Sequence, residues 1–329
     1  MRERAVASRV TLWVFVEAHR YLVALGLLAV VFVAMLVVGT LMPDASARLA
    51  GEDPVETAFQ AFIGATITGV TLVLTLNQVV LSQELGAVGD QRERMAGAME
   101  FRDDAAGLLD APVSPHEPSA FLRKLIEHAG GRAAALREGV REDAGPEAVE
   151  RIVELSDAVE ENAAAAGAEL DGAQFGTFDV VSAALDFNYS AKIYAARRLQ
   201  AEDADALTEE GHSALDELVE TLTAFGPARE HFKTLYIQWE LIDLSRTLLA
   251  TAVPALLASA CMVLYYEAPA DSGTVAGLDV PVLVVSVATA IAALPFVVLL
   301  AYVLRIATVT KRTLSIGPFT LRRTDGSEP

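Results

Sequence analysis

Cysteine is almost absent from this chain of 329 residues, and lysine is scarce. The one cysteine, Cys261, lies in an apolar stretch, so neither a disulfide framework nor a cysteine metal site can form within a single chain. Lysine accounts for four of the 25 basic residues, while 44 residues are acidic, and the formal net charge is −19. The basic surface that nucleic acids require is therefore missing, and we expect no nucleic-acid partner.

Catalytic motifs are missing as well. The five histidines show no metal-ligand spacing, and the chain has no glycine-rich phosphate loop, nucleophile elbow or kinase signature. Carboxylate-rich runs such as the one around Glu154 and Asp157 have helical spacing, which is typical of a solvated face. No stretch supplies the 12-residue acidic loop of a calcium site. We therefore expect no enzyme activity, no cofactor and no metal.

The acidic excess is confined to the middle of the chain. Residues 84–242 hold 32 acidic and 14 basic side chains, whereas the remainder holds 12 and 11. The chain is nevertheless 53% hydrophobic, so an acidic, water-facing block is carried by nearly neutral apolar segments. The low lysine content and the even spread of acids favour adaptation to a salt-rich, halophilic cytoplasm; the alternative is a domain that evolved to bind a cationic partner.

Long apolar runs predict a membrane protein. Four segments reach the length of about 20 residues that a helix needs to cross a bilayer. They are Tyr21–Met42, Ala58–Leu81, Leu244–Tyr266 and Val280–Leu304. The first run is too long, and its leader too extended, for a cleaved signal peptide.

Basic residues predict the orientation of these spans. Arginines precede the first span, and basic residues follow the second and the fourth, whereas the segments Pro43–Thr57 and Glu267–Asp279 are acidic. Because cytoplasmic flanks carry the excess of arginine and lysine, both termini and the middle block are expected in the cytoplasm of a multi-pass protein of the cell membrane.

The middle block is expected to be entirely helical, because β-hairpin signals are missing from it. Prolines, glycines and polar breaks predict helices over about 118–140, 146–170, 178–202 and 208–225, with a break at Gly226-Pro227. The second span is expected to continue as a helix toward Leu109, and a helix from Ala228 is expected to run straight into the third span. The predicted fold is therefore all-α, with a helical cytoplasmic domain (84–242) between two spans (1–83) and two further spans with a short basic tail (243–329).

A periodic polar stripe interrupts the second span. Its members recur every three or four residues and, at about 100° per residue, share one helix face roughly 80° wide. These residues are Gly64, Thr68, Thr71, Thr75, Gln78 and Ser82. Lipid gives such a face no partners, so we expect it either to pack against helices within or between subunits, or to line a water-filled axis of a ring of five or more copies, such as a pentamer.

Further polar residues accompany the stripe. Asn77 and Thr66 lie about 160–180° around the helix from Thr68, and Asn77 is expected to fix helix register through a partner, or else to coordinate a ligand or ion. Where the helix leaves the membrane, Glu84 and Arg92 are candidates for shaping the electric field at an inner mouth. The alternative is that they are ordinary solvated charges.

The layout resembles that of bestrophin-type anion channels: four spans, both termini inside and a helical insertion between the second and third spans. This resemblance of topology implies a pentamer whose second span lines the pore. Two features of that family are missing, namely its aromatic and branched apolar neck and its acidic calcium clasp after the fourth span. The segment Thr75–Gly86 (TLNQVVLSQELG) also resembles one in uncharacterised membrane proteins of halophiles, which implies no activity.

The sequence thus favours a homo-oligomeric ion channel in the lipid bilayer, with the second span lining its axis. The rival hypothesis is a membrane-anchored sensor or scaffold, in which the stripe is a packing seam and the cytoplasmic helices bind a partner without conduction. A small-solute transporter is a third, weaker hypothesis, because the inverted repeats and broken helices of transporters are not visible.

Overall fold

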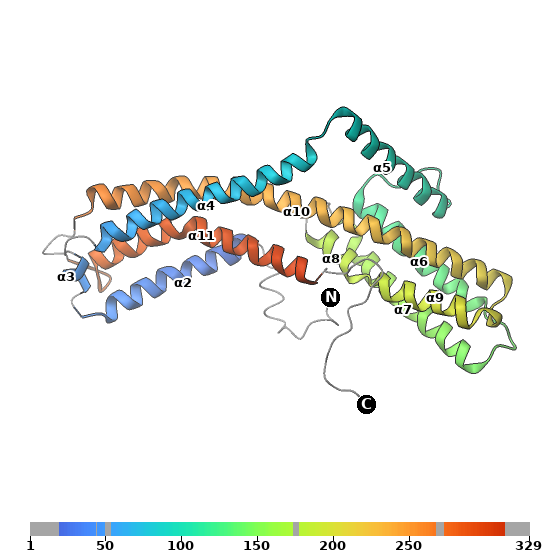
Figure 1. The fold of residues 1–329 in the computed structure, drawn as a ribbon. Helices are drawn as coiled ribbons and strands as arrows, with labels where there is room; N and C mark the ends of the chain where they lie inside the picture. The colour runs from blue at the N-terminus through green and yellow to red at the C-terminus, as the bar shows by residue number, and fades with distance from the viewer. Residues whose placement is uncertain (1–19, 44, 50–53, 174–177, 268–272, 313–329) are drawn as a thin grey trace. The chain divides into compact units, whose positions relative to one another are not determined.

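The computed structural model describes residues 20–43, 45–49, 54–173, 178–267 and 273–312, and in this part of the chain the fold is all-α (Figure 1). Two compact units divide it. The apolar unit comprises the described residues up to Leu85 together with Gln238–Lys311, and the helical domain comprises Gly86–Ile237. One long helix, α10 (Glu209–Tyr265), contributes its first half to the helical domain and its second half to the apolar unit.

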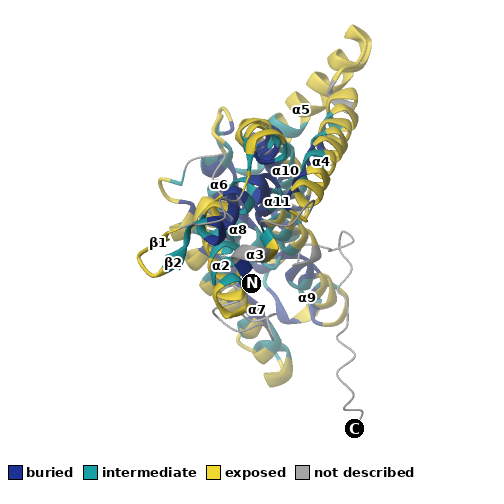
Figure 2. Ribbon diagram, turned by 90° about the vertical axis from the view of Figure 1, so that its left-hand side faces the viewer, coloured by how far each residue is buried: buried dark blue, intermediate teal, exposed yellow. Residues whose placement is uncertain are grey.

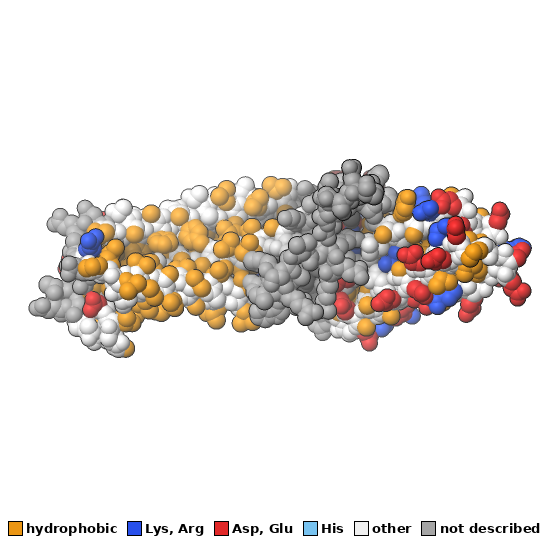
Figure 3. Space-filling model, turned by 90° about the horizontal axis from the view of Figure 1, so that it is seen from below, with side chains coloured by type: hydrophobic (Ala, Val, Ile, Leu, Met, Phe, Trp, Pro, Cys, Tyr) orange, Lys and Arg blue, Asp and Glu red, His pale blue; other side chains and the backbone are white. Residues whose placement is uncertain are grey.

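The apolar unit is built from helices that are long and apolar enough to cross a membrane, and each predicted span lies within one of them to within one residue. Figure 3 shows apolar side chains covering the visible face of this unit, while charged side chains gather over the helical domain. Beside the second half of α10, the elements of the unit are α2 (Arg20–Leu41), α3 (Ala45–Leu49), α4 (Pro54–Glu84), the hairpin strands β1 (Thr274–Val275) and β2 (Leu278–Asp279), and α11 (Val280–Arg312).

Helix α11 forms the centre of the apolar unit. More than half (56%) of its most apolar stretch is buried, against 6% for α2. One cluster joins α4, α10 and α11 around Val73, Leu248 and Tyr302, and a second joins them around Phe59 and Met262. Most of the outward apolar surface of the unit therefore has no protein cover within one chain, as expected of helices that face lipid.

The helical domain has a core of its own. Its aliphatic and aromatic centre is supplied mainly by α6, α7 and the first half of α10, with α8 and α9 packed on α7. The elements are α5 (Val88–Leu108), α6 (Pro118–Glu138), α7 (Pro146–Leu170), α8 (Phe178–Asp186), α9 (Tyr189–Glu202), the short 3₁₀ helix η3 (Ala204–Ala206) and the first half of α10. Prolines stand in the first turns of α6 and α7, where their missing N–H groups cost nothing.

The predicted break at Gly226-Pro227 is wrong, because α10 passes through both residues without interruption. Gly226 serves a tertiary contact instead: a Cβ at this position would come within 2.9 Å of the Tyr189 ring. The same ring stacks edge-on with Phe225 at 5.9 Å and lies 4.7 Å from the Arg229 guanidinium. Glycine is therefore needed here for close packing of α9 on α10 rather than for a turn.

Two other predicted helices are interrupted. The second span does not run on toward Leu109, because α4 ends at Glu84 and α5 begins at Val88. The predicted helix 178–202 is split between α8 and α9 by Asn162 of α7. The Asn162 amide donates to the Asp186 carbonyl at 3.1 Å and accepts from the Asn188 backbone N–H at 3.1 Å, so a side chain from another helix satisfies the groups that the break exposes.

Candidate functional site

Helix α4 has a buried face and, on its opposite side, an exposed polar face. Phe59, Thr66 and Val73 are buried against the apolar unit, and these residues recur at helical spacing. The predicted stripe is centred about 160° away from them around the helix. Every member of the stripe, from Gly64 to Ser82, is exposed (Figure 2). The stripe is therefore not used for packing against the described part of the chain.

The hydroxyl groups of the stripe bond back to the helix that carries them. Thr68 donates to the Gly64 carbonyl at 2.9 Å, and Thr71 donates to the Ile67 carbonyl at 2.8 Å. Thr75 donates to the Thr71 carbonyl at 2.9 Å, and Ser82 donates to the Val79 carbonyl at 2.7 Å. Such bonds remove the cost of the hydroxyl protons in hydrocarbon and still leave each oxygen able to accept a hydrogen bond from outside the helix.

Gln78 differs from the hydroxyl residues of the stripe. Its side chain is exposed, and no described residue forms a hydrogen bond with its amide. A primary amide has two donor hydrogens and one acceptor oxygen. Exposed apolar side chains flank the stripe on both sides, including Ile67, Leu72 and Val79, each more than half exposed. An isolated chain in a bilayer would thus expose an unsatisfied amide to lipid, and its loss of hydrogen bonds to water would cost on the order of several kcal/mol.

Thr66 and Asn77 lie on the buried side of α4, as their helical positions predict. Thr66 is 2% exposed, whereas Asn77 is half-buried. The expected partner of Asn77 is missing among the described residues, because its Oδ1 atom is buried without a hydrogen bond. The amide thus stands one turn beyond Val73, on the face that α4 turns toward the other helices of the apolar unit.

The two residues proposed for an inner mouth fall in different units. Glu84 is the last residue of α4, and its side chain lies outside the described part of the structure. Arg92 lies in the second turn of α5 and is exposed. Each is placed within its own unit, and a joint role of the two stays a prediction.

A buried ionic cluster in the apolar unit escaped sequence reasoning. Arg20 of α2 forms an ion pair with Glu240 of α10, which is 3% exposed, and its guanidinium lies 5.0 Å from the Tyr302 ring of α11. Asp243 lies 3.9 Å from the same guanidinium, and the Tyr302 hydroxyl is 3.5 Å from Thr247 Oγ1. The signal in the sequence is a pair of acids, Glu240 and Asp243, at the edge of the apolar run that begins at Leu244.

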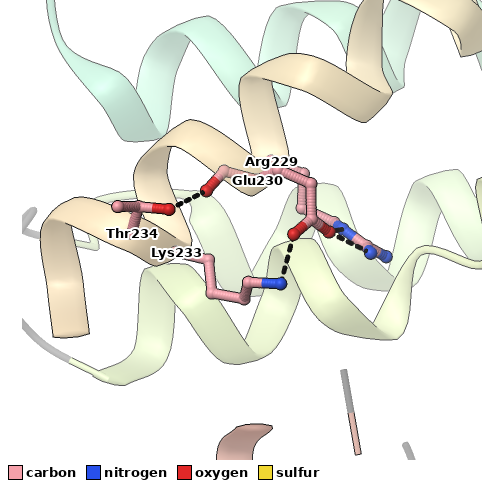
Figure 4. Close-up of polar contacts among 4 residues, drawn as sticks. All are labelled: Arg229, Glu230, Lys233 and Thr234. Atoms are coloured by element: carbon pink, nitrogen blue, oxygen red, sulfur yellow. Dashed lines mark hydrogen bonds and ion pairs between the residues drawn. The ribbon is translucent and has the colours of Figure 1, made fainter. Parts of the chain in front are cut away.

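A second ionic cluster lies on the part of α10 that belongs to the helical domain. The Glu230 carboxylate accepts from Arg229 at 2.6 Å and from Lys233, and Thr234 Oγ1 donates to the Glu230 carbonyl at 2.9 Å (Figure 4). Burial raises the pKa of Glu230, but the hydrogen bonds from Lys233 and Arg229 outweigh it and hold that pKa below its usual value. The Arg229 guanidinium of this cluster also lies against the Tyr189 ring, so the cluster links α10 to α9.

The helical domain also has a groove of about 690 Å³ between one face of α7 and one face of α9. Small residues such as Ala158 and Ala195 line it, together with side chains of both charges. Tyr194, 69% exposed, stands among its lining residues. Lys192 is nearly buried there and donates to Asn162 Oδ1 at 2.7 Å. Among the described residues, no group of histidine, cysteine and acidic side chains is arranged to hold a metal ion.

Comparison with known proteins places the chain in a family without assigning it an activity. A family of unknown function, DUF7972, matches residues 1–329, and the chain belongs to it. Neither the curated proteins nor the solved structures contain a match to the chain. These comparisons therefore assign no function to the chain. Among its structural features, the exposed polar face of α4 on an otherwise apolar helix is the one that a function has to explain.

Proposed function

We propose that this member of DUF7972 is a homo-oligomeric ion channel of the cell membrane, in which the polar face of α4 from each copy lines a central axis. Four apolar helices would cross the bilayer, with the helical domain and both termini on the cytoplasmic side, where the basic flanks of the spans favour placing them. This layout resembles that of bestrophin-type channels. The resemblance supplies only one element of the proposal, namely that the second span, α4, lines the pore.

The exposed amide of Gln78 carries the proposal. It lies on the face opposite the buried side of α4, flanked by apolar side chains, with no hydrogen-bond partner among the described residues. Partners have to come from another copy or from water, because lipid tails supply neither donors nor acceptors. Rotational symmetry brings the same face of every copy to one axis, so each Gln78 would find both its symmetry mates and any water along that axis.

The other residues of the stripe support a wet axis rather than a sealed seam. Thr68, Thr71 and Thr75 hold their hydroxyl protons on backbone carbonyls, which leaves oxygen lone pairs directed away from the helix. A ladder of such oxygens, ending in a ring of Gln78 amides, gives a permeating ion or water repeated weak contacts. Several weak sites in series are what conduction requires.

Ion flux through liposomes tests the proposal. Purified protein reconstituted into liposomes should pass ions above the background of empty liposomes, and Gln78→Leu and Thr75→Leu should reduce the flux strongly. Leu76→Ile, on the exposed apolar flank of the same helix, is the matched control and should leave flux unchanged. No flux above background, together with no effect of Thr75→Leu, would refute the channel.

The α7–α9 groove favours a second candidate function, a membrane-anchored scaffold whose helical domain binds a partner protein. Its small lining residues would let another helix approach closely, and the exposed Tyr194 ring is an anchor of the kind found at interfaces. Oligomer geometry separates the two functions. A dimer with its α4 helices in contact and no conduction favours the scaffold, whereas a ring of five or more copies with separated α4 helices favours the channel.

A further inference from the structure

The polar face of α4 extends beyond the six residues of the stripe, toward the start of the helix. Gln60 lies 18 residues before Gln78, which is about five complete turns, so the two amides lie on the same side of the helix. Both side chains are exposed. At a rise of about 1.5 Å per residue they are about 27 Å apart along α4, close to the thickness of the hydrocarbon core of a bilayer. The polar face is therefore long enough to run from one side of that core to the other.

A carboxylate stands beside this face in the first turn of α4, the end that the orientation of the spans places outside the cell. Gln60 Nε2 donates to Glu56 Oε1 at 2.8 Å, and both residues are exposed. Glu56 lies about 80° from the centre of the stripe, and the hydrogen bond holds its carboxylate toward Gln60. This bond uses one of about four acceptor sites of the carboxylate, so the others stay open to water or to a cation.

Cationic side chains are missing along the whole of α4. From Pro54 to Glu84 the helix contains no lysine, arginine or histidine, whereas its first turn has one acid and its last residue is another. Rings of arginine or lysine select anions in pores, and rings of aspartate or glutamate select cations. A pore lined by α4 therefore offers an anion no cationic group along the length of the helix.

The neutral groups of the face favour a cation as well. Thr68, Thr71 and Thr75 give their hydroxyl protons to carbonyls of the same helix, so each presents oxygen lone pairs to its surroundings. Oxygen atoms are the ligands that replace the hydration shell of a permeating cation, whereas a chloride ion needs N–H or O–H donors. Most of the hydroxyl donors of the stripe are thus withdrawn from an anion, while the acceptors remain.

We infer that the proposed channel conducts alkali cations and excludes chloride. The Glu56 carboxylates concentrate cations at the outer entrance, and the hydroxyl oxygens of the stripe coordinate them along the axis. This selectivity rests on the proposed oligomer, because only symmetry brings the polar faces of several copies around one axis. It is the opposite of the selectivity that a resemblance to bestrophin-type anion channels implies, and α4 has hydroxyl groups in place of the apolar neck of that family.

The charges on both sides of the spans agree with cation conduction. Pro43–Thr57 holds four acids and one base, and Glu267–Asp279 holds three acids and no base; both segments are expected outside the cell. Residues 84–242, which follow the inner end of α4 in the sequence, hold 32 acids and 14 bases. Such acidic surfaces raise the local concentration of cations at low salt. At about 1 M salt the screening length falls to about 3 Å, so the oxygens in contact with the ion then decide the selectivity.

Currents through planar lipid bilayers that contain the purified full-length protein test the inference. Under a tenfold gradient of potassium chloride, the native channel should reverse near the potassium equilibrium potential, about 59 mV in size; the chloride potential has the opposite sign. Glu56→Lys should move the reversal potential toward the chloride value and lower the potassium-to-chloride permeability ratio several-fold.

Glu267→Lys is the matched control for the change of charge. Glu267 is an exposed acid of an outer segment, and the adjacent Tyr266 packs with Phe59 on the buried side of α4, away from the stripe. The control should keep the native reversal potential. Thr75→Val removes one hydroxyl oxygen per copy and keeps the branched side chain, so it should lower the potassium conductance several-fold even at 1 M salt.

The outcomes separate failure of the selectivity from failure of the channel. Currents that reverse at the chloride potential, or that show no preference, would overturn the cation selectivity and leave the channel standing. If Glu56→Lys and Glu267→Lys give the same reversal potential, the Glu56 carboxylates do not act at the entrance. An unchanged conductance of Thr75→Val at 1 M salt would overturn coordination by the hydroxyl oxygens. Absence of any current would refute the proposed channel and its selectivity together.

Discussion

Arg20 of α2 and Glu240 of α10 form a partly buried ion pair although 220 residues separate them in the sequence. Tyr302 of α11 covers the guanidinium from one side, at 5.0 Å from its ring centroid. Three helices of the apolar unit thus meet at one polar cluster. Apolar clusters supply most of the packing, and the ion pair adds a directional contact between α2 and α10.

Breaking this pair from one side should destabilise the apolar unit. Glu240→Ala removes the nearest carboxylate from the largely buried Arg20 guanidinium, and we expect a loss of about 3 kcal/mol. Replacement of both partners by methionine should cost clearly less, because no charge is then left uncompensated. Asp243→Asn, at a side chain that is 51% exposed, is the control. Denaturant unfolding in detergent, followed by tryptophan fluorescence, measures all three; equal losses for the single and double variants would contradict the prediction.

A pair of glycines should be sensitive to a single methyl group. A Cβ on Gly139, at the end of α6, would lie 2.3 Å from the Gly211 Cα atom of α10. The Cβ added by Gly211→Ala would lie 2.5 Å from the Gly139 carbonyl oxygen. This substitution should therefore destabilise the helical domain by about 1–3 kcal/mol through overpacking. Gly131→Ala, inside α6 with open space around it, should instead stabilise by up to about 1 kcal/mol. Opposite shifts of the unfolding midpoint confirm the prediction, and equal shifts refute it.

Acid should weaken the helical domain through His128. Burial and the nearby Arg132 charge lower the pKa of His128 below its usual 6.5, although Glu217 and Asp110 oppose the shift. Because the folded state holds the neutral imidazole, this contribution to stability is complete above pH 6.5 and is lost as the pH falls from there toward the lowered pKa.

The pH dependence can be assigned to this residue by substitution. Unfolding midpoints measured between pH 7.5 and pH 5.5 should fall less steeply for His128→Gln than for the native chain. His212→Gln, at an exposed position of α10, should leave the native slope unchanged. If the two variants share one slope, His128 is not the group responsible.

Salt should stabilise the helical domain. Residues 84–242 hold 32 acidic and 14 basic side chains. At low ionic strength the excess carboxylates of the folded domain therefore repel one another. Raising potassium chloride from about 0.1 M to 1 M shortens the screening length from about 10 Å to 3 Å, and the unfolding temperature should rise. Circular dichroism across this series checks the prediction, and an unfolding temperature that falls with salt would contradict adaptation to a salt-rich cytoplasm.

Long-range packing explains where sequence reasoning fell short. The four apolar helices, and the start of α6 and of α7, could be predicted because run length and first-turn prolines are local signals. The break between α8 and α9 depends on Asn162, a side chain from another helix, and no local pattern records it. Gly226 resembles a helix end in the sequence but accommodates the Tyr189 ring.

The polar face of α4 shows the same division. Its periodicity placed Thr66 and the stripe on opposite sides of one helix, and the burial of Thr66 agrees with that geometry. What the stripe touches depends on copies of the chain that no single sequence can place. The pairing of Arg20 with Glu240 was equally out of reach, because either residue alone reads as an ordinary charge at the edge of a span.

A single-particle structure of the purified protein in lipid nanodiscs, resolved well enough to count subunits and locate Gln78, would test the proposed channel most directly. We predict a ring of five or more copies, with the Gln78 side chains around an open axis. A monomer, a dimer with its α4 helices in contact, or a ring with Gln78 facing lipid would contradict it.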